Sequence, residues 1–148
     1  MSSLNIIDQI APCGLDCSRC ATYKDGEIPR LASRLTELLK GYSRVAKMRE
    51  NTAKEFQGYA QFEDVLNALT TGNCGGCRSE AVQCPIECKP KECTKEKKVD
   101  FCFQCPEYVA CTGPSCTRWR KLNDRLKEIG VPAFYKEQLR TPRYSKIL

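Results

Sequence analysis

The chain has 148 residues, of which 12 are cysteine and none is histidine, and it carries a formal net charge of +6. This length accommodates one compact domain, and the absence of histidine excludes Ser-His-Asp triads, Cys-His nucleophile pairs and histidine-bound catalytic zinc. The charge excess lies in residues 117–148, which hold nine basic and three acidic side chains, whereas the two signs balance in residues 1–116.

Two amphipathic segments in the first half of the chain predict a helical hairpin. Residues 29–47 carry an apolar stripe at three- and four-residue steps: Leu31, Leu35, Leu38, Tyr42 and Val45. Residues 53–71 begin after a capping box formed by Thr52 and Glu55, and Gly72 follows their end. Their apolar face comprises Tyr59, Phe62, Leu66 and Leu69. We expect each helix to bury its stripe against the other.

The second half of the chain combines a metal-binding region with a basic helix. Residues 72–116 hold nine of the cysteines and little apolar periodicity, which predicts turns and short irregular or β knuckle segments around metal. Residues 116–130 predict an amphipathic helix with Trp119, Leu122, Leu126 and Ile129 on its apolar side. Residues 131–148 show no clear period and are expected to form a C-terminal tail. The fold prediction is a single, mostly α domain over residues 1–130, stapled by metal.

The cysteine spacing indicates metal binding. Cys17 and Cys20, Cys74 and Cys77, and Cys102 and Cys105 are pairs separated by two residues, which is chelate spacing. The N-terminus lacks the pattern of a secretory signal, and no apolar run is long enough to cross a membrane. We therefore expect a cytoplasmic protein with reduced thiols and no membrane contact.

All twelve cysteines are candidate metal ligands, and they divide into three sites of four. Tetrathiolate sites favour about three zinc ions, and an iron–sulfur cluster is the alternative. The spacing does not fix which cysteines share an ion. The preferred division is Cys74, Cys77, Cys102 and Cys105; Cys13, Cys17, Cys20 and Cys111; and Cys84, Cys88, Cys93 and Cys116.

The ordered cysteine motifs resemble those of domain of unknown function family 3795, a family of short cysteine-rich proteins of bacteria and archaea. The motifs are Cys13-Gly-Leu-Asp-Cys17-Ser-Arg-Cys20-Ala-Thr-Tyr23, Cys74-Gly-Gly-Cys77-Arg78, Cys93, and Val99-Asp-Phe-Cys102-Phe-Gln-Cys105-Pro-Glu-Tyr108-Val-Ala-Cys111. The resemblance covers residues 11–122 and implies zinc binding with no established activity. The chain departs from the family pattern at Ala110, where a proline is usual, and Cys116 is additional.

Three functions follow from these residues as alternatives. The preferred one is a structural zinc-binding domain that acts as a non-catalytic interaction module, with a protein partner favoured over nucleic acid. The second is a nucleic-acid-binding zinc protein that uses Arg118, Lys121 and Arg125 on the basic helix. The third is an iron–sulfur electron-transfer or redox protein, or an open zinc site with Asp16 or Glu107 as base.

Overall fold

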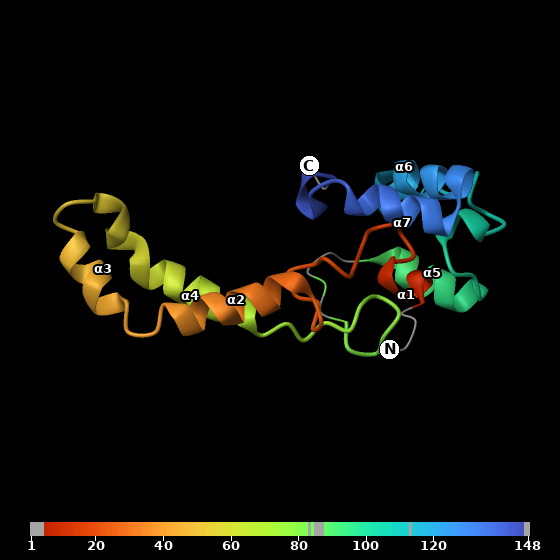
Figure 1. Cartoon of the computed structure of the whole chain (residues 1–148). Coiled ribbons are helices and arrows are strands. Elements are labelled where there is room, and N and C mark those ends of the chain that lie inside the picture. The colour runs from red at the N-terminus through yellow and green to blue at the C-terminus, as the bar shows by residue number, and fades with distance from the viewer. Residues whose placement is uncertain (1–4, 83, 85–87, 113, 147–148) are drawn as a thin grey trace. The chain divides into compact units, whose positions relative to one another are not determined.

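The computed structural model describes residues 5–82, 84, 88–112 and 114–146, of which 114–118 and 146 are described as backbone only. The described chain is mostly helical, which confirms the predicted fold class (Figure 1). It divides into two compact units, residues 21–73 and the remainder, and we describe each by itself. No helix in the described ranges is long and apolar enough to span a membrane.

The unit of residues 21–73 is the predicted hairpin, with its helices broken into shorter pieces. Its elements are α2 (Glu27–Leu38), α3 (Ser43–Arg49), the 3₁₀ helix η1 (Lys54–Gly58) and α4 (Tyr59–Thr70). Gly41 has a φ of 83°, in the left-handed region, and this turn ends the first predicted helix early. The predicted capping box does not form, because the Thr52 hydroxyl donates to the carbonyl of Arg49 instead.

The predicted packing of the α2 stripe is wrong. Ala32 on α2 and Leu66 on α4 are buried at 6% and 7% exposure, whereas Leu31 is 50% and Leu38 65% exposed. The small side chain of Ala32 favours close approach of the two backbones. The stripe of larger residues therefore lies beside the contact between α2 and α4 and faces solvent.

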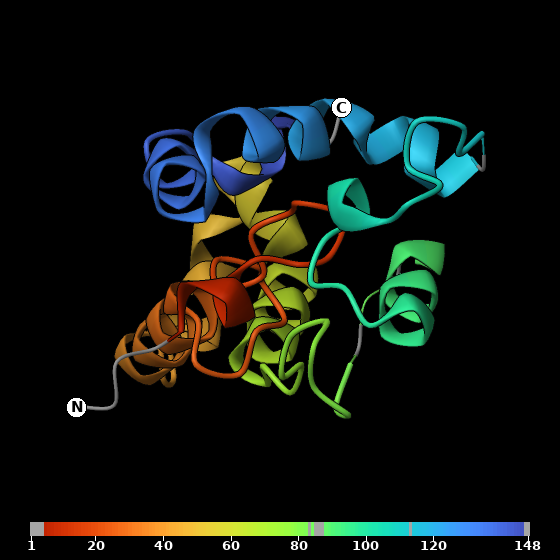
Figure 2. The ribbon, with the colours of Figure 1, turned by 90° about the vertical axis from the view of Figure 1, so that its right-hand side faces the viewer.

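The second unit carries all twelve cysteines and is built from helices joined by turns and loops (Figure 2). Its elements are α1 (Ile6–Gln9), α5 (Lys89–Lys97), η2 (Cys102–Gln104), α6 (Pro114–Ile129), α7 (Val131–Leu139) and η3 (Arg143–Lys146). An isolated antiparallel bridge joins Ile10 and Asp16. This bridge closes the loop that presents Cys13.

The core of this unit lies where α6 and α7 pack on the N-terminal segment. Ile10, Phe101, Leu126 and Phe134 form one cluster, and each is at most 1% exposed. The apolar side predicted for the basic helix is confirmed, because Leu126 joins this cluster and Trp119 is also buried.

Residues 131–148, for which a C-terminal tail is expected from the sequence, contain α7 and η3. Gly130 has a φ of 79°, and Pro132 stands in the first turn of α7, where proline is tolerated. The glycine and proline that predict the end of α6 therefore also begin another helix.

Candidate metal centres

The structure gathers eight of the cysteines into two groups. We call Cys13, Cys17, Cys77 and Cys88 the first thiol group, and Cys93, Cys102, Cys105 and Cys111 the second thiol group.

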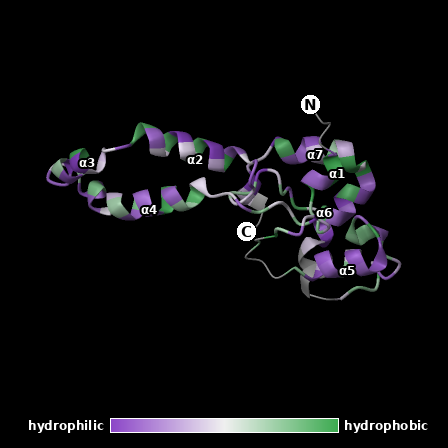
Figure 3. Ribbon diagram, turned by 90° about the horizontal axis from the view of Figure 1, so that it is seen from below, coloured by the Kyte–Doolittle hydropathy of each residue, from purple (hydrophilic) through white to green (hydrophobic). Residues whose placement is uncertain are grey.

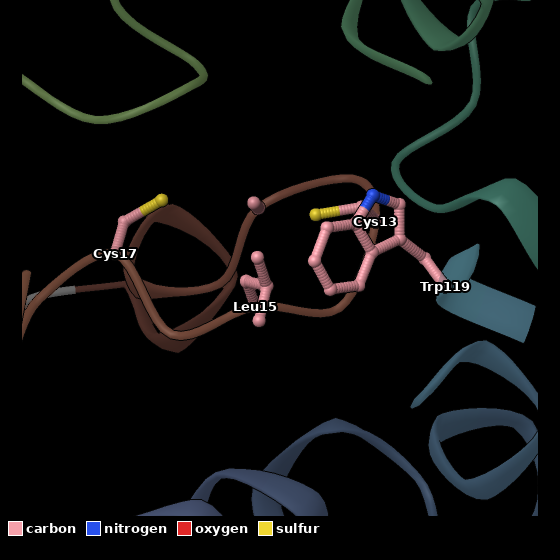
Figure 4. Packing of buried hydrophobic residues seen from close by; sticks show 5 residues of the cluster. Cys13, Leu15, Cys17 and Trp119 are labelled. Atoms are coloured by element: carbon pink, nitrogen blue, oxygen red, sulfur yellow. The ribbon is translucent and has the colours of Figure 1, made fainter. Parts of the chain in front are cut away.

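In the first thiol group, the side chains meet in pairs. The thiols of Cys13 and Cys88 hydrogen-bond to each other, and so do those of Cys17 and Cys77. Figure 4 shows the indole ring of Trp119 beside the sulfur of Cys13, with Cys17 on the far side of Leu15. Segments that are 60 or more residues apart in the sequence thus bring four sulfurs into one region.

Hydrogen bonds stabilise the thiolate form at two positions of the first thiol group. The thiol of Cys77 donates to Cys17 and is the largest factor lowering the pKa of Cys17 to about 7; the backbone N–H of Cys77 and the nearby Arg143 act in the same direction. The thiol of Cys13 likewise lowers the pKa of Cys88 to about 6. The two donors, Cys13 and Cys77, have raised pKa values for the same reason and because of burial. Thiolates that receive N–H and S–H donors are the form that binds metal.

The loop that holds Cys13 and Cys17 is fixed by polar contacts around the buried Asp16. Asp16 is fully buried and accepts hydrogen bonds from the Ser18 hydroxyl and the Arg19 guanidinium. Arg19 also donates to the carbonyls of Gln138 and Thr141, and Arg143 donates to the carbonyl of Asp16. These contacts tie the C-terminal residues to the loop.

The second thiol group lines a small cavity. The cavity measures about 60 Å³, and its walls include Cys93 from α5, Cys102 from η2, and Cys105 and Cys111 from the turns that follow. The turns repeat every three residues, because the N–H groups of Cys105, Tyr108 and Cys111 donate to the carbonyls of Cys102, Cys105 and Tyr108. This repeat is what directs three of the cysteines to the same cavity.

Side chains of α6 hold the second thiol group in place. Arg120 donates to the carbonyls of Tyr108 and Cys111, at 3.0 Å and 2.7 Å, and its guanidinium lies 4.6 Å from the Tyr108 ring centroid. The Tyr108 hydroxyl donates to Asp124 at 2.6 Å. The turns that carry Cys105 and Cys111 are therefore anchored to a helix.

Asn123 joins the backbones of both thiol groups. It is 1% exposed, its Oδ1 accepts from the N–H of Phe103 at 3.1 Å, and its Nδ2 donates to the carbonyl of Cys13 at 2.9 Å. Gly14, next to Cys13, has a φ of 93°, and a Cβ there would lie 2.8 Å from the Cβ of Leu122. The close approach of α6 to this loop therefore requires glycine.

We expect Asn123→Ala to lower the free energy of unfolding by about 2–4 kcal/mol, because it leaves two buried backbone groups without a partner. Urea unfolding followed by circular dichroism measures this loss. Lys121→Ala, at an exposed position of the same helix, is the control and should change the free energy by less than about 0.5 kcal/mol. Equal losses in both variants would contradict this role of Asn123.

The two groups differ from the division preferred on sequence grounds. Cys102 and Cys105 lie with Cys93 and Cys111 instead of with Cys74 and Cys77, and Cys77 lies with Cys17. The reason is that α5, which carries Cys93, and the turns after η2 bring these cysteines together, and neither is evident from spacing.

Three further cysteines, Cys20, Cys74 and Cys84, lie outside the two groups. Cys84 is exposed and lines a hollow of about 350 Å³ with Cys77 and Cys88, at the edge of the first thiol group. Cys74 is buried, and Cys20 accepts a hydrogen bond from the Tyr144 hydroxyl at 3.6 Å. The side chain of Cys116 lies outside the described residues.

The positions of the side chains do not by themselves define a metal site. Among the described residues, no three or more cysteine, aspartate or glutamate side chains are grouped closely enough to hold an ion. Zinc binding, and the count of about three ions, stay predictions at this point.

The candidate partner-binding and catalytic residues are mostly engaged within the chain. Arg125 forms ion pairs with Glu128 at 2.8 Å and Glu137 at 2.9 Å. Lys121 is exposed, and the Arg118 side chain lies outside the described residues. Of the two candidate bases, Asp16 is buried in its own hydrogen bonds, and Glu107 pairs with Lys97 at 2.9 Å beside the second thiol group.

Three residues that organise the unit are not among the candidates predicted from the sequence: Arg78, Arg120 and Asn123. Arg78 donates to the carbonyls of Ile7, Ile10 and Asp100 and lies over the Phe101 ring. Its position directly after Cys77 is the signal that could have identified it. For Arg120 and Asn123 the signal is weaker, because a polar residue beside the apolar stripe of a helix is common.

Comparisons with known proteins give a family and no closer relative. No curated protein and no solved structure matches the chain significantly. A family model matches residues 9–115, a segment that includes both thiol groups and eleven of the twelve cysteines, and its description is a protein of unknown function, DUF3795. Since this match covers more than half of the chain, the chain belongs to the DUF3795 family.

Proposed function

We propose that this protein binds zinc through its two thiol groups, one ion in each, and that the ions stabilise the cysteine-bearing unit. The observation that carries the proposal is the cavity of about 60 Å³ lined by Cys93, Cys102, Cys105 and Cys111. Four thiolates complete the tetrahedral coordination of zinc and leave no position for water or substrate. The proposed role of the metal is therefore structural.

The chemistry of the first thiol group supports a site there as well. Zinc–sulfur bonds of about 2.3 Å place the sulfurs of one site roughly 3.8 Å apart, which is close to the separation of hydrogen-bonded thiols. The four sulfurs of this group already form two hydrogen-bonded pairs. Rotation of the side chains can bring the two pairs around one ion. Each thiol then loses its proton, and a bond to the metal takes the place of the S–H hydrogen bond.

The wider role that we propose is a non-catalytic interaction module of the cytoplasm, where thiols stay reduced. Arg125 is paired with Glu128 and Glu137, which offsets the attraction of this residue for a phosphate backbone and favours a protein partner over nucleic acid. The engagement of Asp16 and Glu107 favours a structural role over a hydrolytic one.

Metal analysis of protein purified without oxygen tests the proposal. We expect two zinc ions per chain from the two groups, and a third if the remaining cysteines also form a site. Cobalt(II) substitution should give the absorption of tetrahedral thiolate coordination. Cys102→Ser should remove one ion and Cys13→Ser another, whereas Cys20→Ser should leave both groups loaded.

Several results would contradict the two-site arrangement. A brown protein containing iron and sulfide would favour the iron–sulfur alternative. A metal-free protein that keeps its fold would exclude a structural metal. Loss of the same ion in Cys102→Ser and Cys13→Ser would mean that the two groups share one site.

A further inference from the structure

The side of α2 that was expected to be buried is exposed. Leu31, Leu35 and Leu38 are 50%, 40% and 65% exposed, and they follow one another at steps of four and three residues. Such spacing places them along one side of the helix. An apolar stripe of this kind on a surface helix normally packs against a partner.

The neighbouring helix extends this apolar surface. On α4, Phe62 is 44% and Val65 60% exposed, and Figure 3 shows hydrophobic segments on both helices. Successive residues of a helix are rotated by about 100° around its axis. Around the axis of α2, the leucine stripe is therefore rotated by about 60–120° from the buried Ala32. Around the axis of α4, Phe62 and Val65 are rotated by about 40–100° from the buried Leu66, in the same direction. Because the helices of a hairpin are antiparallel, the same sense of rotation brings both sets to one face. We call these five residues the hairpin face.

The size of the hairpin face suits an interface between proteins. Its five side chains expose on the order of 400 Å² of apolar surface, which is within the range of the largest apolar patches on monomers, and such patches are often functional. One side of a standard interface buries about 800 Å², of which about 65% is apolar in homodimers. The hairpin face thus supplies most of the apolar area that one protomer of a homodimer needs.

The charges of this unit favour a second copy of the chain over an anionic surface. Residues 21–73 hold eight basic and seven acidic side chains. On α2, Arg30 and Arg34 are paired with Glu27 and Glu37 within the helix. A nearly neutral unit has no strong attraction for phospholipid headgroups or nucleic acid, and two copies of it do not repel each other.

We propose that the hairpin face docks on the hairpin face of a second copy, forming a symmetric four-helix bundle between two protomers. A hairpin is one layer of helices, and a second layer is the usual way to cover its apolar side. A two-fold axis brings the same patch of both copies together, so the aliphatic stripes can interdigitate.

Sedimentation velocity of the full metal-loaded chain over a wide concentration range tests this proposal. We expect a dimer for the wild type, and a dissociation constant raised about 100-fold or more in the double variant Leu35→Glu, Val65→Glu, because charges would be buried without partners. Val109→Glu is the control: Val109 is 87% exposed and lies outside residues 21–73, so this variant should remain dimeric. A wild type that is monomeric throughout, or a double variant that dimerises normally, would overturn the proposal.

A photo-crosslinking residue in place of Phe62 tests the contact without adding charge. Crosslinks between protomers should map to α2 and α4 of the second copy. Crosslinks between protomers that map only to residues outside the hairpin would overturn the proposal. Circular dichroism of each variant shows whether its helices are intact.

Discussion

Removal of the zinc that we propose is expected to unfold the cysteine-bearing unit and to shift the fluorescence of Trp119 to longer wavelength. A structural zinc site contributes about 10 kcal/mol or more of apparent folding free energy, which is comparable to the whole stability of a typical domain. Trp119 is the one tryptophan of the chain, is 6% exposed, and belongs to the buried cluster that includes Cys13 and Cys17. Its emission therefore reports directly on the proposed first site.

The measurement is a titration with a strong chelator, followed by Trp119 emission and near-ultraviolet circular dichroism. Adding zinc back under reducing conditions should restore both signals, whereas adding magnesium, which prefers oxygen ligands, should not. If the emission stays at its native wavelength after all metal has been removed, the ions do not support the packing around Trp119.

The sequence predicts the buried side of a helix correctly where its apolar stripe packs on the core of its own unit. In α6, Trp119 and Leu126 are buried as the helical period predicts. In α2 the period is equally clear, yet Leu31 and Leu38 are exposed because Ala32 makes the closer helix contact. A stripe shows which side of a helix is apolar, but it does not show what covers that side.

The helix that matters most for the second thiol group has almost no sequence signal. α5 runs through Lys89–Lys97, and its buried residues are Pro90 and Thr94 instead of an apolar stripe. The Thr94 hydroxyl donates to the carbonyl of Pro90 at 2.8 Å, so this buried polar group has a hydrogen-bond partner within the helix and needs none from water. Since Cys93 reaches its group only through this helix, spacing alone could suggest candidate ligands but could not assign them to the two thiol groups.

The contacts that position the cysteines were also beyond local reasoning. Asn123 lies 110 residues from Cys13, and Arg143 lies 127 residues from Asp16. Both are polar residues whose roles depend on the tertiary structure. The last 18 residues also depend on tertiary structure. Their sequence shows no helical period, yet α7 forms there and packs against Ile10 and Phe101.

Phe134→Ala is expected to lower the free energy of unfolding by about 3–5 kcal/mol, because it removes a fully buried ring from the cluster of Ile10, Phe101 and Leu126. Ile10 bridges to Asp16, so the same cavity should loosen the loop that carries Cys13 and weaken zinc retention under chelator. Urea unfolding of the metal-loaded protein measures the first effect. Leu139→Ala, at a position of α7 that is 47% exposed, is the control and should cost much less. A loss no larger than that of the control would mean that α7 does not contribute to the core.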